Sequence, residues 1–245
     1  MWQAFHDEIQ RWHAADRQPR LWLRDDDAIA PSPALDRLTA LAEKHRATVL
    51  LAVIPRGAGA DLARHVAAHP LLHPCQHGFA HANHAPAGEK KQELGPHRAL
   101  ADVADELAAG RAKLLDLFGD ALRPVLVPPW NRIDAALLSQ LPAIGLHGLS
   151  VFGKPAQPAG GRLDSNVDIM DWHGTRGGLA TAALVPLLVR ALETARNNGG
   201  APVGILTHHL VHDEEAWTFL EALFAQTGEC RWVSFDTLAL QKSAA

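Results

Sequence analysis

Short apolar runs alternate with longer amphipathic segments along this chain, and the alternation predicts its secondary structure. The apolar runs are brief and rich in Val, Leu and Ile, as in TVLLAVIP (48–55), which is typical of strands buried on both faces. We expect strands at 21–24, 48–55, 71–76, 122–128, 146–151, 166–170, 202–208 and 231–235. We expect helices at 2–15, 33–45, 59–68, 97–118, 133–141, 180–197 and 213–226.

This order of elements predicts an α/β protein with a parallel sheet, because strand–helix alternation builds right-handed βαβ units. Seven or eight strands over 245 residues favour a TIM-barrel-like closed sheet, which typically needs about 250 residues. A doubly wound open sheet is the alternative, since strand order cannot be read from one sequence. No linker divides the chain, so we expect one domain over 1–245, with 1–18 as an N-terminal helical extension.

Composition narrows the function classes. The formal net charge is −4 and no basic stripe occurs, which argues against nucleic acid as a partner. Only two cysteines, Cys75 and Cys230, are present, which indicates a reducing compartment. The first twenty residues lack the apolar core of a secretory signal, and no apolar run approaches the roughly 20 residues of a membrane span. We therefore expect a cytoplasmic protein without a membrane span.

Polar and aromatic side chains gather where the predicted strands end. In a parallel barrel all the C-terminal strand ends open on one face, where active sites are built. The residues at these ends are Asp25–Asp27, His77, His81, Pro128–Arg132, Asp171, Trp172, His208 and His209.

The spacing of His77 and His81 predicts a metal site. Two histidines four residues apart fall on one face of a helical turn, so their rings can converge. A carboxylate from Asp25–Asp27 could complete a set of two imidazoles and one carboxylate, which leaves a position open for water, as in catalytic sites. The alternative, a pair of exposed helix residues, is less attractive beside the other polar strand ends.

The motif order over residues 21 to 210 resembles that of the polysaccharide deacetylases. These enzymes form carbohydrate esterase family four, also called the nodulation-factor deacetylase homology domain. The matching features are an acidic pair, His-x-x-x-His, Pro-Pro-aromatic, Asp-x-x-Asp-Trp and Leu-x-His, each after a predicted strand. The resemblance implies a deformed (β/α) barrel and a divalent metal, most commonly Zn²⁺, with Co²⁺, Fe²⁺, Ni²⁺ or Mn²⁺ as alternatives.

Carried over residue by residue, the resemblance implies a metal site with a base beside it. Asp26 is then the metal-binding carboxylate, and His77 and His81 are the imidazole ligands. Asp25 is the general base that takes a proton from the attacking water.

The resemblance also implies an acid and a substrate groove. His208 is then the general acid, and Asp171 orients it. His209 is the alternative acid, but side chains alternate along a strand and the Leu-x-His spacing selects His208. The residues expected to bind substrate are Pro129, Trp130, Arg132, Trp172 and Leu206.

Two departures from the family pattern leave part of this assignment open. The first motif usually ends in Asp-Asp-Gly, but Asp27 stands at the glycine position, so the base and the ligand among Asp25–Asp27 are not fixed. The third motif usually begins with an arginine that pairs with the base, and Val127 stands there. Arg132 or Arg24 could supply the missing guanidinium.

These residues favour hydrolysis of an N-acyl amide on an amino sugar or related small substrate. A metal held by imidazoles and one carboxylate activates water, and an acid is needed because an unprotonated amine leaves poorly. The alternatives are a catalytically silent carbohydrate-binding protein on the same fold and a metal-dependent amidohydrolase of non-sugar substrates.

Overall fold

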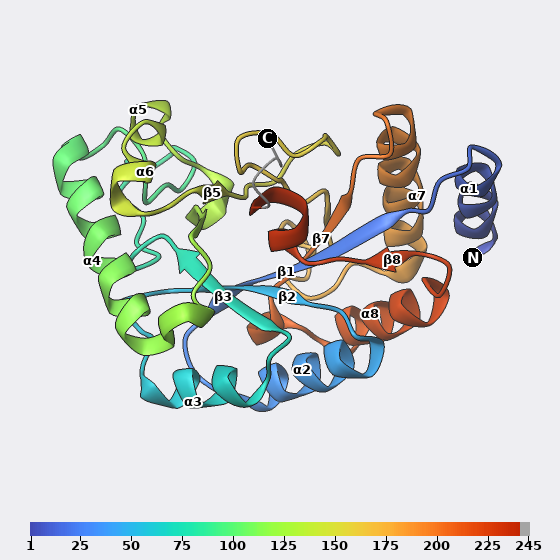
Figure 1. Cartoon of the computed structure of the whole chain (residues 1–245), viewed down its shortest axis with the longest axis horizontal. Helices are drawn as coiled ribbons and strands as arrows, with labels where there is room; N and C mark the ends of the chain where they lie inside the picture. The colour runs from blue at the N-terminus through green and yellow to red at the C-terminus, as the bar shows by residue number, and fades with distance from the viewer. Residues whose placement is uncertain (241–245) are drawn as a thin grey trace.

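A curled sheet of parallel strands forms the centre of the computed structural model, which describes residues 1–240 (Figure 1). The strand order is β5-β4-β3-β2-β1-β7-β6, and β8 pairs with the start of β1. The strands are β1 (Arg20–Ala28), β2 (Val49–Val53), β3 (Leu72–His77), β4 (Val125–Val127), β5 (Gly148–Leu149), β6 (Val167–Asp168), β7 (Val203–Thr207) and β8 (Arg231–Trp232). The predicted α/β barrel of parallel strands is thus confirmed, and the doubly wound alternative is set aside.

Hydrogen bonds between the segments flanking β5 and β6 complete the curl. Leu163 donates its N–H to the carbonyl of Leu149 at 3.0 Å, and Ser165 donates to Val151 at 2.9 Å. These contacts and a parallel bridge between Phe152 and Ser165 join the two ends of the sheet. The barrel is therefore deformed, because isolated bridges replace long strands at this side.

Helices cover the outside of the sheet, from α4 round through α3, α2 and α8 to α7 (Figure 1). The α-helices are α1 (Gln3–Ala14), α2 (Pro33–His45), α3 (Ala60–Ala68), α4 (Leu100–Phe118), α5 (Ala135–Leu138), α6 (Leu141–Ile144), α7 (Thr181–Asn197) and α8 (Glu214–Gln226). Short helical turns are η1 (Gly119–Ala121), η2 (Pro129–Asn131), η3 (His209–Val211) and η4 (Asp236–Leu240). Ser32 caps α2, since its Oγ accepts the N–H of Leu35 at 3.1 Å, and Pro33 opens the helix.

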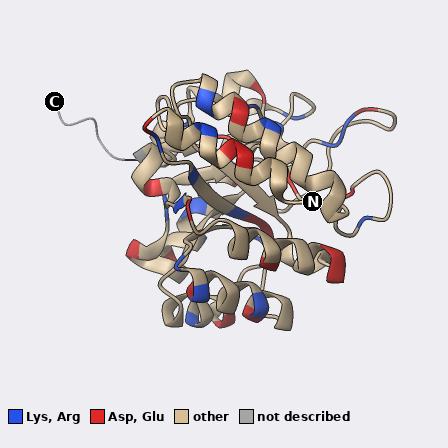
Figure 2. Cartoon of the chain, turned by 90° about the vertical axis from the view of Figure 1, so that its right-hand side faces the viewer, with Lys and Arg blue, Asp and Glu red and all other residues tan. Residues whose placement is uncertain are grey.

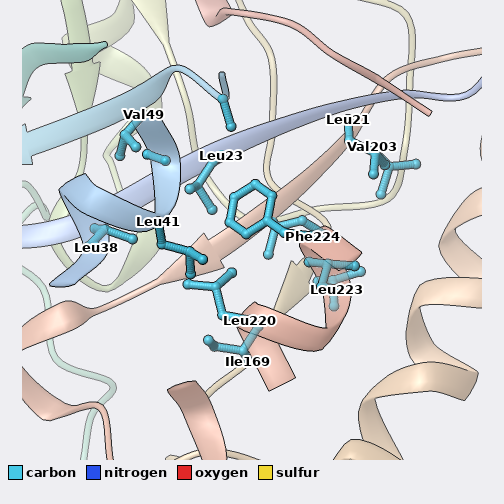
Figure 3. Close-up of a cluster of buried hydrophobic side chains, with 14 of the residues drawn as sticks. Leu21, Leu23, Leu38, Leu41, Val49, Ile169, Val203, Leu220, Leu223 and Phe224 are labelled. Atoms are coloured by element: carbon cyan, nitrogen blue, oxygen red, sulfur yellow. The ribbon is translucent and has the colours of Figure 1, made fainter. Parts of the chain in front are cut away.

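Alternation along β1 divides the core into an outer and an inner part. Leu21 and Leu23 face the outer helices and belong to the large cluster shown in Figure 3, where α2 and α8 supply Leu38 and Leu220. Trp22, between them, belongs to a separate cluster inside the curl of the sheet. The N-terminal helix α1 adds Phe5, Ile9 and Trp12 to the outer cluster, so it packs as part of the core.

Some predicted elements differ from the structure. The helix expected at 133–141 is two short helices, α5 and α6, because Pro142 has no N–H to continue the preceding turn. The last strand covers Arg231–Trp232 in place of 231–235.

The surface agrees with the charge distribution in the sequence. On the face in Figure 2, basic and acidic residues are intermingled over the helices and form no single basic stripe. Among the described residues, every helix is too short or too polar to cross a bilayer.

Candidate active site

The predicted site residues lie at the C-terminal ends of strands that belong to one parallel sheet. Asp27 lies near the end of β1, His77 ends β3, Trp130 follows β4, and Asp168 ends β6. His208 directly follows β7. Because every pairing in the sheet is parallel, these ends share one edge of the barrel.

Three side chains converge on one point at this edge. The Nε2 atoms of His77 and His81 lie 3.0 Å and 3.3 Å from Oδ1 of Asp27. Ligand atoms of these three residues all fall within 4.8 Å of one another, close enough to share a metal ion. Burial alone would raise the pKa of Asp27, but the hydrogen-bonding ring of His77 and the nearby His208 and His81 hold that pKa well below its ordinary value.

The hydrogen bonds around this cluster leave two acceptor atoms facing each other. Nδ1 of His77 lies 2.9 Å from the carbonyl oxygen of Val127, so this nitrogen carries the ring proton. In the neutral ring, Nε2 then offers a lone pair toward Asp27 Oδ1, which is buried without a donor among the described residues. Two acceptors that face each other need a proton or a metal ion between them, and this donor set suits Zn²⁺.

The two histidines are not on a helix, so that part of the sequence interpretation was wrong. His77 is the last residue of β3, and His81 lies in an irregular segment with a backbone φ of 55°. The rings meet because Gly78 turns the chain directly after the strand, at φ 52°. A Cβ on Gly78 would lie 2.0 Å from Glu93 Oε2, so only glycine fits at this turn.

Glu93 shapes the segment between the histidines, and sequence analysis missed it. Its buried carboxylate accepts the N–H groups of Phe79 at 3.1 Å, Ala80 at 2.7 Å and Ala82 at 3.3 Å. Glu93 lies in a polar loop with no periodicity, and no signal in the sequence distinguishes it from its neighbours. The glutamate therefore positions His81 from outside the metal cluster.

The side chains of Asp25, Asp26 and Asp27 lie in three different environments. Asp25 and Asp26 point to opposite faces of β1, as neighbours on a strand do. Asp27 has a left-handed φ of 72°, and the pairing of β1 with β2 shifts register between Asp25 and Ala28. The carboxylate beside the two histidines is therefore that of Asp27, whereas the sequence analysis expected Asp26.

Asp26 instead forms a buried ion pair with Arg24. Nε of Arg24 lies 2.9 Å from Asp26 Oδ1, and Nη2 lies 2.9 Å from Oδ2. Nη2 also donates to Oδ1 of Asn131 at 2.7 Å, and Nη1 donates to Ser150 Oγ at 3.0 Å. This fork of contacts fixes the carboxylate of Asp26 in place.

Arg24 and Arg132 were the two candidates to replace the family arginine that is absent at Val127. Of these two, Arg24 contacts the acidic residues. Arg132 donates its Nη1 to the carbonyl of Lys91 at 2.9 Å, on the rim of the site. Asn131, to which the sequence analysis gave no role, links the turn after β4 to Arg24.

His208 faces Asp26 across the site. Its Nε2 lies 3.9 Å from Asp26 Oδ2, and its ring meets Trp172 edge-on with centroids 4.6 Å apart. Trp172 donates its indole N–H to Asp168 Oδ2 at 2.8 Å. Burial raises the pKa of Asp168, and the nearby His208 opposes that shift.

Asp171 has other partners than His208. Its two carboxylate oxygens accept the N–H groups of Gly174 at 3.0 Å and Thr175 at 3.1 Å. These bonds close the turn that follows β6. Of the two carboxylates in the Asp-x-x-Asp-Trp motif, Asp168 therefore lies near the imidazole of His208, whereas Asp171 binds the backbone of the turn.

Asp25 lies on the outer side of β1, away from the metal cluster. It pairs with His209, whose Nδ1 lies 2.5 Å from Asp25 Oδ1, and neither side chain is exposed. Burial opposes both charges, but the pair lowers the pKa of Asp25 and raises that of His209. Asp25, which the sequence analysis expected to be the base, is thus in a buried contact with His209, which it considered as the alternative acid.

The remaining predicted substrate residues surround the site. Pro129 is buried against Gly78, and Trp130 adopts a φ of 54° that brings its ring within 4.4 Å of the ring of His81. Leu206 pairs with Arg24 in the sheet and is fully buried. Trp172 is 39 % exposed, and a cavity of about 860 Å³ opens beside it, between α7 and the 152–155 segment.

Comparison with known proteins rests on structure. No protein-family model matches the sequence, and no curated protein matches it. Among solved structures, a protein from Mycobacterium smegmatis assigned as a polysaccharide deacetylase matches with a TM-score of 0.66 and 15 % identity, over 91 % of this chain and 89 % of its own. A family 4 carbohydrate esterase from Streptomyces lividans, in complex with acetate, matches with a TM-score of 0.56 and 16 % identity, over 85 % and 87 %.

A pseudoenzyme is also among the matches. It comes from Bacillus anthracis, belongs to the same esterase family, and has a TM-score of 0.56 and 12 % identity over 91 % of this chain and 66 % of its own. A mutant of this pseudoenzyme with restored activity matches as well. At these identities the likeness concerns the fold. The chain therefore has the deformed (β/α)-barrel fold of the carbohydrate esterase family 4 deacetylases, as the order of its motifs implied.

Proposed function

We propose that this chain is a metal-dependent deacetylase of carbohydrate esterase family 4, which removes an N-acetyl or other N-acyl group from an amino sugar or related small substrate. The observation that carries the proposal is the convergence of Asp27, His77 and His81 beside the facing pair Asp26 and His208. A metal cluster, a carboxylate base and an imidazole acid are the groups that amide hydrolysis requires.

The metal ligands in this proposal are Asp27, His77 and His81, with Zn²⁺ as the first candidate. When bound, Zn²⁺ lowers the pKa of coordinated water toward about 7 and polarises the amide carbonyl. Asp27 replaces the Asp26 of the motif-based assignment, because Asp26 is held by Arg24. Val127 orients His77 through its carbonyl, which directs Nε2 into the cluster.

Asp26 is the general base in this proposal, and Arg24 is its partner. The family pattern pairs the base with an arginine, and here the Arg24 guanidinium makes that contact. The two contacts with Arg24 hold the carboxylate in place, from where it would accept a proton from the attacking water. Asp25 has no such access because it is fully buried against His209.

His208 is the general acid, and it protonates the leaving amine. Trp172 packs against its ring, and Asp168 is joined to Trp172 by the indole N–H. We propose Asp168, in place of Asp171, as the carboxylate that orients His208, acting through the ring of Trp172.

Two aromatic rings define the expected substrate contacts. Trp130 lies beside His81 and Trp172 lies beside His208, and both offer flat apolar faces, on which sugar rings stack. The cavity beside Trp172 has the size of a small-molecule site. We propose a soluble or lipid-linked amino sugar as the substrate, and a cytoplasmic location, with which the buried unpaired Cys75 and Cys230 agree.

The alternative of a silent carbohydrate-binding protein rests on Val127, which stands where the family has its arginine. The Arg24–Asp26 ion pair argues against this alternative, because Arg24 on another strand supplies a guanidinium in place of the family arginine.

Metal analysis together with acetate release tests the proposal. Protein purified with Zn²⁺ should bind about one ion, and His77→Ala should bind none. The loaded protein should release acetate from N-acetylated amino sugars, and Asp26→Asn should abolish this while it keeps the metal. Bound metal without turnover on sugars or simple amides would establish the binding protein, whereas turnover on non-sugar amides alone would establish the amidohydrolase.

A further inference from the structure

A buried carboxylate outside the proposed mechanism makes three contacts with the end of β7. Asp25 Oδ2 accepts the hydroxyl of Thr207 at 2.7 Å and the backbone N–H of His209 at 2.9 Å. Its Oδ1 meets Nδ1 of the His209 ring. Neither Asp25 nor His209 is exposed to solvent, so neither can touch a substrate.

These contacts hold the residues on both sides of His208. Asp25 pairs with Thr207 in the register of β1 and β7, and His209 follows His208 directly. On β1, the next residue after Asp25 is Asp26, whose Oδ2 lies 3.9 Å from Nε2 of His208. Asp25 is therefore the direct neighbour of Asp26 in the chain, and it contacts the two direct neighbours of His208.

A second contact holds the backbone of His208 itself. Its N–H lies 3.3 Å from Nε2 of His212, which follows the short turn η3. The end of β7 thus contacts β1 through Asp25, and it contacts the segment after η3 through His212.

We infer that the Asp25–His209 pair is a positioning device that sets the place of His208 relative to Asp26. This inference rests on the proposed function, in which those two residues are acid and base. A displacement of about 1 Å in a reacting group can lower a rate by 10²-fold, so a rigid anchor behind the acid has a direct effect on turnover. Asp25 and His209 are positioning residues, since they act through the backbone that carries His208.

Two substitutions of nearly equal size separate the hydrogen bond from simple packing. His209→Asn keeps an N–H donor close to the position of Nδ1, whereas His209→Leu has no donor. We expect His209→Leu to lower kcat about 10–100-fold, with KM and metal content unchanged, and to move the His208 ring away from Asp26 in its crystal structure. His209→Asn should keep kcat within about threefold of the wild type and the ring in place.

Thr207→Val provides a milder variant if His209→Leu does not fold. It removes one contact to Asp25 and should lower kcat several-fold at unchanged KM. Leu223→Ala, in the outer core at α8, is a control for lost stability that should leave kcat unchanged. Equal kcat losses in His209→Asn and His209→Leu, or an unmoved His208 ring and full kcat in Thr207→Val, would overturn the inference.

The position of the His208 ring is a readout that does not need turnover. If the wild-type protein shows no activity on any amide, the proposed function fails. Crystal structures of the wild type and both His209 variants then still decide whether the pair positions His208.

Discussion

Adjacent carboxylates in this chain meet different partners because backbone geometry separates them. Asp25 turns to His209 on the outer side of the sheet, and Asp26 turns to Arg24 on the inner side. The left-handed φ of Asp27 directs the third carboxylate to His77. Three neighbouring carboxylates are tolerated because each lies beside a different basic side chain.

The proposed roles of Asp26 and Asp27 predict different losses on substitution. Asp26→Asn should lower kcat by about 10²–10⁴-fold with the metal retained, because only the base is lost. Asp27→Asn should lose the metal first, and activity with it. Steady-state kinetics and metal analysis of both variants, each prepared with Zn²⁺, check this.

The reverse result would restore the motif-based assignment. If Asp26→Asn lost the metal and Asp27→Asn kept it, Asp26 would be the ligand, as the sequence alone suggested.

A buried histidine next to the site predicts how stability depends on pH. Burial lowers the pKa of His212 from 6.5 to about 4, against the opposing charge of Asp25. Between these values the unfolded chain binds the proton and the folded chain does not, so the free energy of unfolding falls as pH falls through this window. The loss amounts to about 3 kcal/mol at full extent.

His212→Gln should flatten this dependence, because glutamine does not titrate and its side-chain oxygen can still accept the N–H of His208. The measurement is denaturant unfolding of both proteins at several pH values between 7 and 4. Parallel curves for the two proteins would show that His212 is not responsible.

At the scale of residues, the sequence predicted which side chains would gather at the strand ends but not which carboxylate would lie beside the histidines. His77, His81 and His208 could be proposed because each lies at or soon after the end of a predicted strand. The choice among Asp25–Asp27 depends on one left-handed residue and one register shift, and non-glycine residues carry no local signal for either.

At the scale of elements, the segment between β3 and α4 holds His81, a proposed metal ligand, without regular structure. The carboxylate of Glu93 replaces the missing helical hydrogen bonds by accepting three backbone N–H groups. The sequence suggested a helical turn here because a spacing of four suits a helix, yet a strand end followed by a glycine turn brings the rings together equally well.

This arrangement predicts that Glu93 controls metal affinity from a distance. Glu93→Ala should weaken Zn²⁺ binding about 10–100-fold, because His81 loses its preset position. Competition with a chelator measures the affinity. Glu89→Ala, an exposed carboxylate in the same loop, is the matched control, and equal affinities in the two variants would contradict the prediction.

At the scale of the whole molecule, the sheet places proposed ligands from two strands at one edge, so metal binding is expected to stabilise the fold that brings them together. At a free Zn²⁺ concentration 100-fold above its Kd, the gain is about 2.7 kcal/mol. For a chain of this size, we expect the melting temperature to rise by about 5–10 °C.

Calorimetry with and without Zn²⁺ checks this shift. His77→Ala should show no rise, whereas His84→Ala, at an exposed loop position, should show the full rise. A rise of equal size in His77→Ala would place the bound ion elsewhere.

The architecture was predictable because strand–helix alternation and barrel length are properties of the entire chain. Short strands were the weaker part: β5, β6 and β8 have two residues each, and their pairing depends on distant neighbours. The closure between the 149–153 and 161–166 segments has no local pattern, so it emerged only in three dimensions.

The position of Arg24 has a consequence for how related chains are found. In the family pattern the guanidinium beside the base belongs to the third motif, where this chain has Val127. Here it comes from β1, two residues before the carboxylate it holds. The same charge can therefore come from a different position in the sequence, so a search pattern that demands arginine at the end of β4 passes over chains built in this way.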